Sequence, residues 1–444
     1  MMRSLFSGVS GLKTHQTKMD VIGNNIANVN TVAYKSQNVT FQELLYQTTQ
    51  NASGANEDTG RGGVNAKQIG LGVTTGAINT SISTAGSSQS TGNPFDIQIK
   101  GDSFFIVSDG SNNYFTRAGA FYVDGAGNLA MTSNGYSVMG WQEDPIAPGT
   151  IKKNNVSPIK IMSPENTTSS PEQTTKAYME GIVDKNSTQL TSTDGLITNI
   201  QVFDSLGFSY IAQFSLHETP VEGEYDMQPV HLLDSKGNDL MNPPSGTPAT
   251  ITLDSYTLSY DIKTGVNTGG PTTITFGPAT GAGMDAFQVP VELDVTATKM
   301  YDNKGTSTIK GVAGDPDGHY TGRKVGKMSG VSVATDGKIT ASYDNGTTKL
   351  LGQIAVASFP NPSGLEKFGD NLYVTTMNSG AFDGIGEDVT AGAGSMSTGV
   401  LEMSNVDLSA EFTDMITTQR GFQANSRIIT VSDSMLEELT NLKR

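Results

Sequence analysis

Residues 4–30 read SLFSGVSGLKTHQTKMDVIGNNIANVN, and this stretch decides the predicted fold because its apolar residues recur at every seventh position. A repeat of seven places one narrow apolar stripe along a helix, like the seam that a coiled coil buries. We therefore expect an N-terminal helix over about residues 4–30, with Ser4 as a possible cap. The stripe consists of Leu5, Leu12, Met19 and Ile26, with Val9 and Ile22 beside it.

The last residues of the chain, 405–444, carry the same signature and predict a second helix. Their repeat consists of Leu408, Met415, Phe422, Ile429 and Leu436, flanked by Phe412, Ile416, Ile428, Met435, Leu439 and Leu442. Each stripe is too short, and too polar around its other faces, to form a stable helix alone. The predicted interface therefore comprises Leu5, Val9, Leu12, Met19, Ile22, Ile26, Leu408, Phe412, Met415, Phe422, Ile429, Leu436 and Leu439.

The stripes leave two interpretations open. The two helices could form a hairpin that completes a monomeric core, or they could contact further copies of the chain. In the C-terminal helix, Gln419, Ser426 and Asp433 are polar where a second seam position should be apolar, and the stripe broadens after Ile428. A broad and partly polar surface favours contacts with several neighbours over one two-stranded seam.

The composition predicts a multidomain, mainly β protein. A chain of 444 residues exceeds one compact core. Charged residues make up only 16% while glycine contributes 51 residues, which is typical of strands joined by many turns. The net charge of -16 argues against nucleic-acid binding, and the lack of cysteine excludes disulfides and thiolate metal sites. No stretch reaches transmembrane length, and residues 1–8 do not form a secretory signal.

Strand-like alternation fills the middle of the chain. It appears at residues 95–99 and 104–107, and it resumes in 197–276 and 331–359. We expect terminal α-helices that pair as a coiled-coil-like stalk, plus two nested mainly-β domains. Residues 51–63 are expected to be a loose loop and 392–399 a Gly/Ser linker. The predicted division is 1–30 with 405–444 (terminal helices), 31–76 with 390–404 (connecting segment), 77–165 with 326–389 (β domain) and 166–325 (inserted outer β domain).

A search for catalytic or ligand-binding motifs returns no candidate site. The four histidines have no metal-binding spacing, and no nucleophile elbow, phosphate loop or dinucleotide fingerprint is present. Residues 315–318 (DPDG) resemble part of a calcium loop, but they lack its remaining acidic positions, so a turn is predicted. We therefore expect no enzyme activity, no cofactor and no metal.

Several motifs resemble those of the bacterial flagellar rod and hook family. They are residues 10–12 (SGL), 20–31 (DVIGNNIANVNT), 92–96 (GNPFD), 101–105 (GDSFF), 115–119 (FTRAG), 419–427 (QRGFQANSR) and 439–444 (LTNLKR). The motif residues at the two ends are Asn24, Asn25, Ala27, Asn28, Asn30, Arg420, Gly421 and Asn425. Three more stretches resemble hook members in particular: 203–207 (FDSLG), 341–346 (ASYDNG) and 359–365 (FPNPSGL). The family often has Gly-Phe-Lys where this chain has Ala33-Tyr34-Lys35, which is a mild aromatic swap.

The resemblance implies a structural subunit of the flagellar hook. Such subunits leave the cell through the flagellar export apparatus without a cleavable signal peptide. Outside the cell they assemble into a curved homopolymer, a universal joint that transmits motor torque from rod to filament. The implied partners are further copies of the chain, the distal rod, the hook cap and the hook–filament junction proteins. Nucleic-acid binding and membrane insertion are not expected.

Three alternatives stay open at this point. A distal rod subunit shares both terminal motifs but lacks a large insertion. A hook–filament junction protein would not share the β-domain motifs. A secreted β-rich adhesin or glycan-active enzyme would fit the acidic composition, but it would need a signal peptide, and an enzyme also a carboxylate pair in a cleft.

Overall fold

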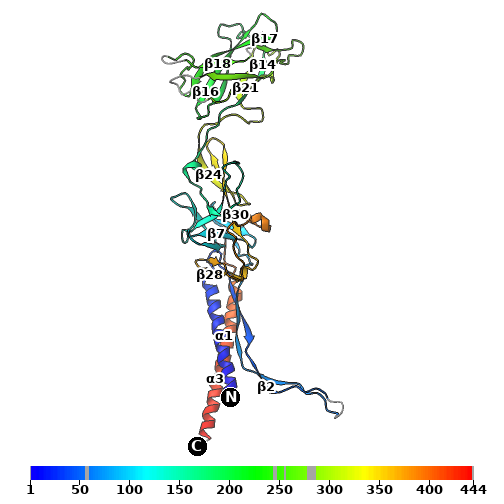
Figure 1. Cartoon of the computed structure of the whole chain (residues 1–444), viewed down its shortest axis with the longest axis vertical. Helices are drawn as coiled ribbons and strands as arrows, with labels where there is room; N and C mark the ends of the chain where they lie inside the picture. Colours follow the sequence, from blue (N-terminus) through cyan, green and yellow to red (C-terminus); the bar gives the residue numbers. More distant parts are fainter. Residues whose placement is uncertain (1, 56–59, 244–247, 255–256, 278–286, 443–444) are drawn as a thin grey trace. The chain divides into compact units, whose positions relative to one another are not determined.

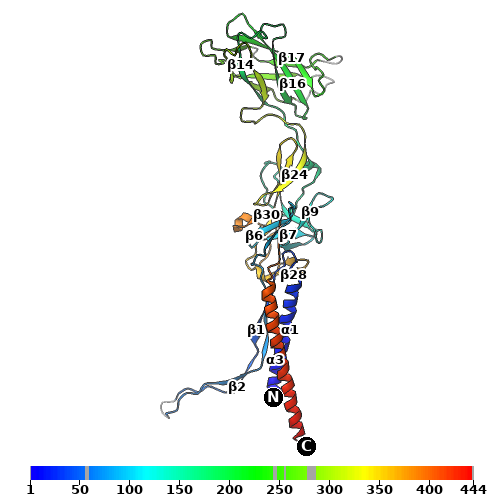
Figure 2. The ribbon, with the colours of Figure 1, turned by 180° about the vertical axis from the view of Figure 1, so that it is seen from behind.

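The computed structural model describes residues 2–55, 60–243, 248–254, 257–277 and 287–442 (Figures 1 and 2). The fold is mainly β with a long helix at each end of the chain, as the composition and the apolar repeats predict. The chain folds into two compact units, each made of segments that are distant in the sequence. Unit 1 is Met1–Ser163, Val331–Thr340 and Leu350–Arg444, and unit 2 is Pro164–Gly330 and Ala341–Lys349.

The two long helices are α1 (Met2–Ala27) and α3 (Leu408–Asn441). The predicted cap Ser4 is wrong, because α1 already includes that residue. The start of α3 is capped by Asp407, whose side chain accepts hydrogen bonds from the backbone N–H groups of Ser409 and Ala410 (2.8 and 3.3 Å). Shorter helices are α2 (Pro164–Thr167), η1 (Pro362–Gly364) and η2 (Val389–Gly392). No helix in the described part of the chain is both long enough and apolar enough to cross a bilayer.

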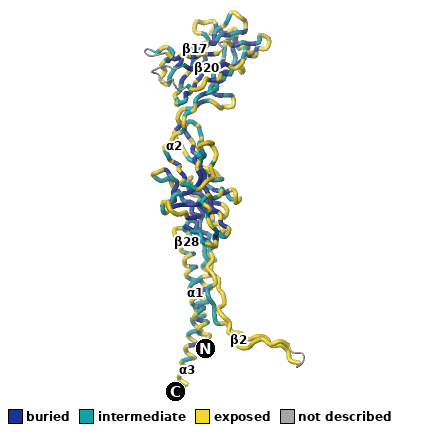
Figure 3. The backbone as a smooth tube through the Cα atoms, in the orientation of Figure 1, coloured by how far each residue is buried: buried dark blue, intermediate teal, exposed yellow. Residues whose placement is uncertain are grey.

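The segment after α1 forms two antiparallel strand pairs, and the described residues of the loop predicted at 51–63 contain no strand, although an isolated bridge joins Ser53 to Val64. These strands are β1 (Gln37–Glu43) with β4 (Val73–Thr80) and β2 (Tyr46–Gln50) with β3 (Lys67–Gly70). Every residue of β2 and β3 is exposed (Figure 3), so no alternation of buried and exposed side chains marks them in the sequence. Residues 56–59 of the predicted loop lie outside the described residues.

The Gly/Ser linker predicted at 392–399 is also wrong. It contains β30, which pairs with β6, and the next strand, β31, pairs with β5. The hydrogen-bonding partners of these strands lie some 300 residues earlier, which local sequence does not reveal. Both strands therefore join the approach to α3 to β5 and β6 of unit 1 in two small two-stranded sheets.

The central sheet of unit 1 is antiparallel, with the order β26-β11-β7-β8-β29-β28. The strands predicted at 95–99 and 104–107 are confirmed as β6 and the buried β7. Besides β1 to β4, the strands that lie wholly in unit 1 are β5 (Ser88–Ser90), β6 (Ile97–Lys100), β7 (Phe104–Ser108), β8 (Asn113–Thr116), β9 (Phe121–Val123), β10 (Leu129–Met131), β11 (Ser137–Gln142), β12 (Ser157–Pro158), β27 (Val356–Ala357), β28 (Glu366–Gly369), β29 (Leu372–Val374), β30 (Ser395–Thr398) and β31 (Val400–Glu402).

The core of unit 1 is aromatic. Phe115 packs edge to face on Phe359 with ring centroids 4.8 Å apart, and Phe104 does so on Tyr373 at 5.7 Å. Trp141, the single tryptophan of the chain, is buried there, and its Nε1 donates to the carbonyl oxygens of residues 154 and 385. Its fluorescence therefore reports on unit 1 alone.

Unit 2 contains two sheets around a shared apolar core. One has the order β18-β20-β21-β14-β22, with β23 also paired to β14, and the other has the order β15-β16-β17-β19. Its strands are β13 (Thr168–Ser169), β14 (Lys176–Val183), β15 (Leu196–Phe203), β16 (Ser209–Glu218), β17 (Glu224–Asp234), β18 (Thr250–Leu253), β19 (Thr257–Ser259), β20 (Thr272–Gly277), β21 (Val291–Asp294), β22 (Thr298–Met300) and β23 (Lys310–Ala313). Three more strands cross the boundary between the units: β24 (Gly326–Val333), β25 (Lys338–Tyr343) and β26 (Thr348–Ile354).

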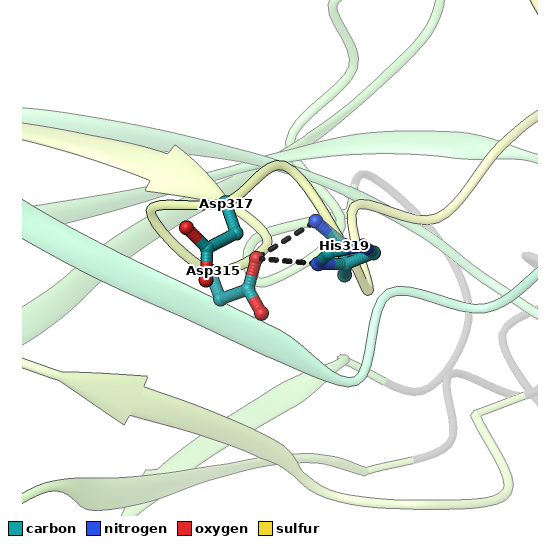
Figure 4. Close-up of side chains that lie close together, drawn as sticks. All are labelled: Asp315, Asp317 and His319. Carbon is teal, nitrogen blue, oxygen red and sulfur yellow. Dashed lines mark hydrogen bonds and ion pairs between the residues drawn. The ribbon is translucent and has the colours of Figure 1, made fainter.

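The turn predicted at residues 315–318 is confirmed. The Gly318 N–H donates to the Asp315 carbonyl (2.9 Å), and the backbone N–H of His319 donates to Asp315 Oδ1 (2.7 Å). Figure 4 shows Asp315, Asp317 and His319 close together, with one possible ligand atom of each within 4.8 Å of the others. Asp315 is thus held as the acceptor of its own turn, which accounts for this grouping without a bound ion.

A buried carboxylate organises the turn between β15 and β16. Asp204 is fully buried, and its Oδ1 accepts from the backbone N–H groups of Leu206 (3.0 Å) and Phe208 (2.8 Å). Its Oδ2 accepts from the hydroxyl of Tyr210, whose pKa is raised mainly by burial and further by the Asp204 charge. The motif at residues 203–207 therefore forms a turn in which the Asp204 carboxylate accepts hydrogen bonds from backbone N–H groups.

Replacing Asp204 by alanine should destabilise unit 2 by about 2 kcal/mol, because the buried Tyr210 hydroxyl and two partly buried N–H groups lose their acceptor. Amide hydrogen exchange of β15 and β16 in the full chain measures this loss. The matched control is Asp194→Ala, since Asp194 is exposed in the turn before β15. Equal exchange in the two variants would contradict the role of Asp204.

Candidate assembly interface at the terminal helices

The two terminal helices lie side by side and antiparallel in unit 1 (Figures 1 and 2). Near the end of α1, Asn25 Nδ2 donates to Glu411 Oε1 (2.9 Å). One to two turns earlier in α1, Lys18 Nζ lies 3.3 Å from Asp414 Oδ2. Residue numbers thus fall along α1 while they rise along α3, which brings the two ends of the chain to the same end of the helix pair.

Glycines let the two backbones approach closely. A Cβ atom at Gly11 would lie 2.8 Å from the side-chain amide of Asn425, and one at Gly421 would lie 2.6 Å from Cε1 of His15. The His15 ring also packs on Phe41 of β1, with centroids 5.5 Å apart. Burial, and secondly the charge of Lys18, lower the pKa of His15. Larger side chains at the two glycines would force the helices apart.

The contacts between α1 and α3 repeat every seven residues, but they are out of phase with the apolar stripes. In both helices the contact residues lie three or six positions after a stripe residue, as His15 and Lys18 do after Leu12, and Ile429 belongs to both sets. The contact residues are small or polar, apart from Ile22, Ile428 and Ile429. They are Gly8, Gly11, His15, Lys18, Ile22 and Asn25 in α1, and Glu411, Asp414, Thr418, Gly421, Asn425, Ile428, Ile429 and Ser432 in α3.

This phase leaves the predicted interface only partly covered by the chain itself. Of its residues, only Ile22 is buried. Half-buried members are Leu5, Leu12, Met19, Ile26, Met415, Phe422, Ile429 and Leu436, and exposed members are Val9, Leu408, Phe412 and Leu439. The heptad repeat did not mark Phe6 and Val431, which are also exposed and apolar. Whether these side chains contact further copies stays a prediction.

Asn25 connects α1 with its surroundings more extensively than any other residue in the predicted motif. It is buried, and its Nδ2 donates to the Gln37 carbonyl (2.8 Å) as well as to Glu411. Its Oδ1 accepts from the Gln37 N–H (3.0 Å) and from the Tyr34 hydroxyl (3.2 Å). Burial raises the pKa of Glu411, whereas the hydrogen bond from Asn25 lowers it. One amide therefore joins α1, β1 and α3.

The other motif residues have more local positions. Asn28 Nδ2 donates to the carbonyl and side chain of Asn24 (2.9 and 3.0 Å), which closes the end of α1. Asn425 Nδ2 donates to the Gly421 carbonyl one turn earlier in α3 (3.0 Å). Ala27, Asn30 and Arg420 are exposed.

Sequence reasoning missed several residues between the helices and the sheet of unit 1. Asn405 Nδ2 donates to the Ser81 carbonyl (2.9 Å), and its Oδ1 accepts from the Ser36 N–H (2.7 Å). Lys35 and Glu402 form a fully buried ion pair. No local pattern marks such contacts, because each joins residues that are more than 300 positions apart.

Residues 33 and 34 depart from the family pattern by more than a mild aromatic swap. Ala33 has φ +56°, a left-handed conformation that glycine adopts far more easily. The Tyr34 hydroxyl donates to Asn25 Oδ1 and accepts from Asn24 Nδ2, both at 3.2 Å, which a phenylalanine could not do. The change from glycine to alanine therefore costs backbone strain, and the tyrosine adds hydrogen bonds that offset it.

Models of three flagellar families match this chain. The "Flagella basal body rod protein" model matches residues 5–35, the "Flagellar hook protein FlgE/F/G D1 domain" model residues 98–172, and the "Flagellar basal body rod FlgEFG protein C-terminal" model residues 397–442. These matches define a structural protein of the bacterial flagellum, a class without enzyme activity. The chain belongs to the flagellar rod and hook family.

Relatives match over the whole chain. The flagellar hook protein FlgE of Treponema pallidum is 35% identical and that of Borreliella burgdorferi 37%, and each match covers 100% of both chains. The flagellar basal-body rod protein FlgG of Bacillus subtilis is 30% identical over 100% of both chains. A crystal structure of the Helicobacter pylori hook protein FlgE2 matches at 14% identity with a TM-score of 0.34, covering 71% of this chain and 100% of that one.

Exchanging Ala33 for glycine should stabilise unit 1 by up to about 1 kcal/mol, because the left-handed backbone is then unstrained. Exchanging Tyr34 for phenylalanine should destabilise it by about 1 kcal/mol. The double variant should be close to the natural chain. Urea unfolding followed by Trp141 fluorescence measures all three, with Tyr122→Phe as the control for an exposed tyrosine. A destabilising Ala33→Gly would contradict the strain argument.

Proposed function

We propose that this chain is the structural subunit of the flagellar hook and that copies of it polymerise through their terminal helices into a curved tube. The proposal of polymerisation rests on which side of each helix faces the other helix of the same chain. Asn25 bonds to Glu411 and Lys18 pairs with Asp414 across the two helices of one chain, while the apolar stripes beside these contacts are only partly covered. Full-length similarity to hook proteins supports the assignment to the hook.

The open stripes supply the driving force for assembly. Phe412 is 50% exposed and Leu439 is 48% exposed. Burying a side chain of this size completely is worth about 1.5–3 kcal/mol, and many such side chains recur along the helices. Because Gly8 lies opposite Ile429, the end of α3 extends past the start of α1. Leu436, Leu439 and Leu442 in this overhang have few contacts available from α1 of the same chain.

The remaining parts of the proposal concern the assembled structure. Unit 2 has the polar, Ser/Thr/Gly-rich surface that allows many weak and interchangeable contacts between neighbours, as a bending universal joint requires. We place the assembled protein outside the cell, after passage through the flagellar export apparatus without a cleavable signal peptide. Its further partners would be the distal rod, the hook cap and the hook–filament junction proteins.

A rod subunit is the second candidate, and the full-length match to the Bacillus subtilis rod protein favours it. The inserted unit 2, with its motif at residues 203–207, supports the hook instead. Deleting the gene separates the two. We expect basal bodies with complete rods and no hooks in electron micrographs. Basal bodies with truncated rods would establish the rod subunit.

Replacing Leu439 or Phe412 by aspartate should abolish polymerisation while leaving the monomer folded, because both side chains are exposed in the single chain and would carry a charge into the contact between copies. Sedimentation and electron microscopy measure assembly, and Trp141 fluorescence measures folding. The control is Ser434→Asp, which adds the same charge at an exposed polar position of α3. Normal tubes formed by Leu439→Asp and Phe412→Asp would refute the interface.

A further inference from the structure

A buried ion pair lies where the chain enters and leaves the two terminal helices. Lys35 follows α1, and Glu402 ends β31 shortly before α3. The Lys35 and Glu402 side chains are 0% and 1% exposed, and Lys35 Nζ lies 2.7 Å from Glu402 Oε1. Nζ also donates to the Thr84 carbonyl (2.7 Å), and Oε1 accepts from the Gly86 N–H (3.1 Å). The second carboxylate oxygen, Oε2, is buried and has no hydrogen-bond partner.

A third charge, Arg117, is buried in the same unit with unused donors. It follows β8 within the motif at residues 115–119, and it is 1% exposed. Its Nη2 donates to the Gly101 carbonyl (2.6 Å), and its guanidinium lies over the ring of Phe104 at 5.4 Å. Its Nε and Nη1 are buried and have no partner. Buried donors without partners are costly, so they normally mark an ordered water or a charge nearby.

The unused atoms of the two side chains complement each other. A water molecule can accept a hydrogen bond from an Arg117 N–H and donate one to Glu402 Oε2, which would satisfy both. Burial lowers the pKa of Arg117, and the Glu402 carboxylate is the largest influence that acts against this lowering. The contacts of the sheet place the two groups in the same region of unit 1. Lys367 Nζ donates to the Lys35 carbonyl (3.2 Å), and Lys367 pairs with Tyr373, whose ring packs on the Phe104 ring under Arg117.

We propose that Arg117 is the third member of this buried ion pair, joined to Glu402 through an ordered water molecule, and that the three charges together fix both terminal helices to the sheet of unit 1. Each charge comes from a different part of the chain: Lys35 from the exit of α1, Glu402 from the entry to α3, and Arg117 from the sheet. Glu402 is the buried anion beside two buried cations, while Asp102, whose charge also acts on both cations, is exposed. Arg117 acts as a positioning residue, because it holds the helix connections through Glu402.

The stability of variants that each lack one charge distinguishes this three-charge cluster from a simple ion pair. Removing the charge of Glu402 leaves two buried cations without a buried anion, whereas removing Lys35 or Arg117 leaves one balanced cation–anion pair. Glu402→Gln should therefore raise the unfolding equilibrium constant of unit 1 by about a hundredfold, and Lys35→Met and Arg117→Met by clearly less. In a simple Lys35–Glu402 pair, Glu402→Gln and Lys35→Met would have similar effects.

The decisive experiment is a rescue by charge removal. Arg117→Met added to Glu402→Gln should restore part of the lost stability, and Arg117→Lys added to Glu402→Gln should not, because lysine keeps the charge. Urea unfolding of the full chain, followed by Trp141 fluorescence, measures the midpoints. If Glu402→Gln does not fold, recovery of a cooperative transition in the double variant is the same test. Additive losses without rescue would overturn the proposal.

Two further measurements separate positioning from general stability. In Arg117→Met, amide hydrogen exchange should rise in residues 33–37 and 403–411 while that of β7 and β11 stays near that of the natural chain. An equal rise in both regions would assign Arg117 to the sheet core alone and overturn the positioning role. A high-resolution map should show water density between Arg117 and Glu402 Oε2. A direct contact or an empty gap there would overturn the water bridge.

Discussion

The packing of α1 against α3 through small and polar residues is the contact on which the rest of the structure depends. At Gly11 and Gly421 the facing helix leaves no space for a larger side chain, so the two backbones come close and the bulky side chains lie to the side. If the two helices packed through large apolar residues, the apolar stripes would be buried between them within one chain. The small seam instead lets the helices pair while their apolar surface remains available for other copies.

The connections between the helices and unit 1 follow from the same arrangement. The end of α1 and the start of α3 must reach the sheet at one place, and polar side chains hold them there. The Asn25 amide of α1 bonds to β1 and α3, and Glu402 faces the buried Lys35. Hydrogen bonds and charges have stricter geometry than apolar contacts, so they define the direction in which the helices leave the sheet. A subunit that transmits torque needs such a defined connection.

The sequence predicted the elements that have strong local patterns, and it failed where the pattern depends on distant partners. The helices, the buried β7 and the turn at Asp315 were predictable from periodicity and turn chemistry. The ribbon of β2 and β3 was not, because its exposed strands show no alternation, and β30 and β31 were not, because their partners lie about 300 residues earlier. The strain at Ala33 was also hidden, since only the folded chain shows that this residue has positive φ.

The sequence by itself determined the period of seven at both ends, the mainly β middle and the membership of the rod and hook family. These follow from local chemistry, because side-chain periodicity and turn residues act over a few positions. The tertiary structure alone decided the phase, namely which side of each helix faces the other. That choice depends on how closely Gly11 and Gly421 let two distant segments approach and on which buried polar groups then find partners. Periodicity reports that a helix has an apolar side, and only packing determines whether the same chain covers it.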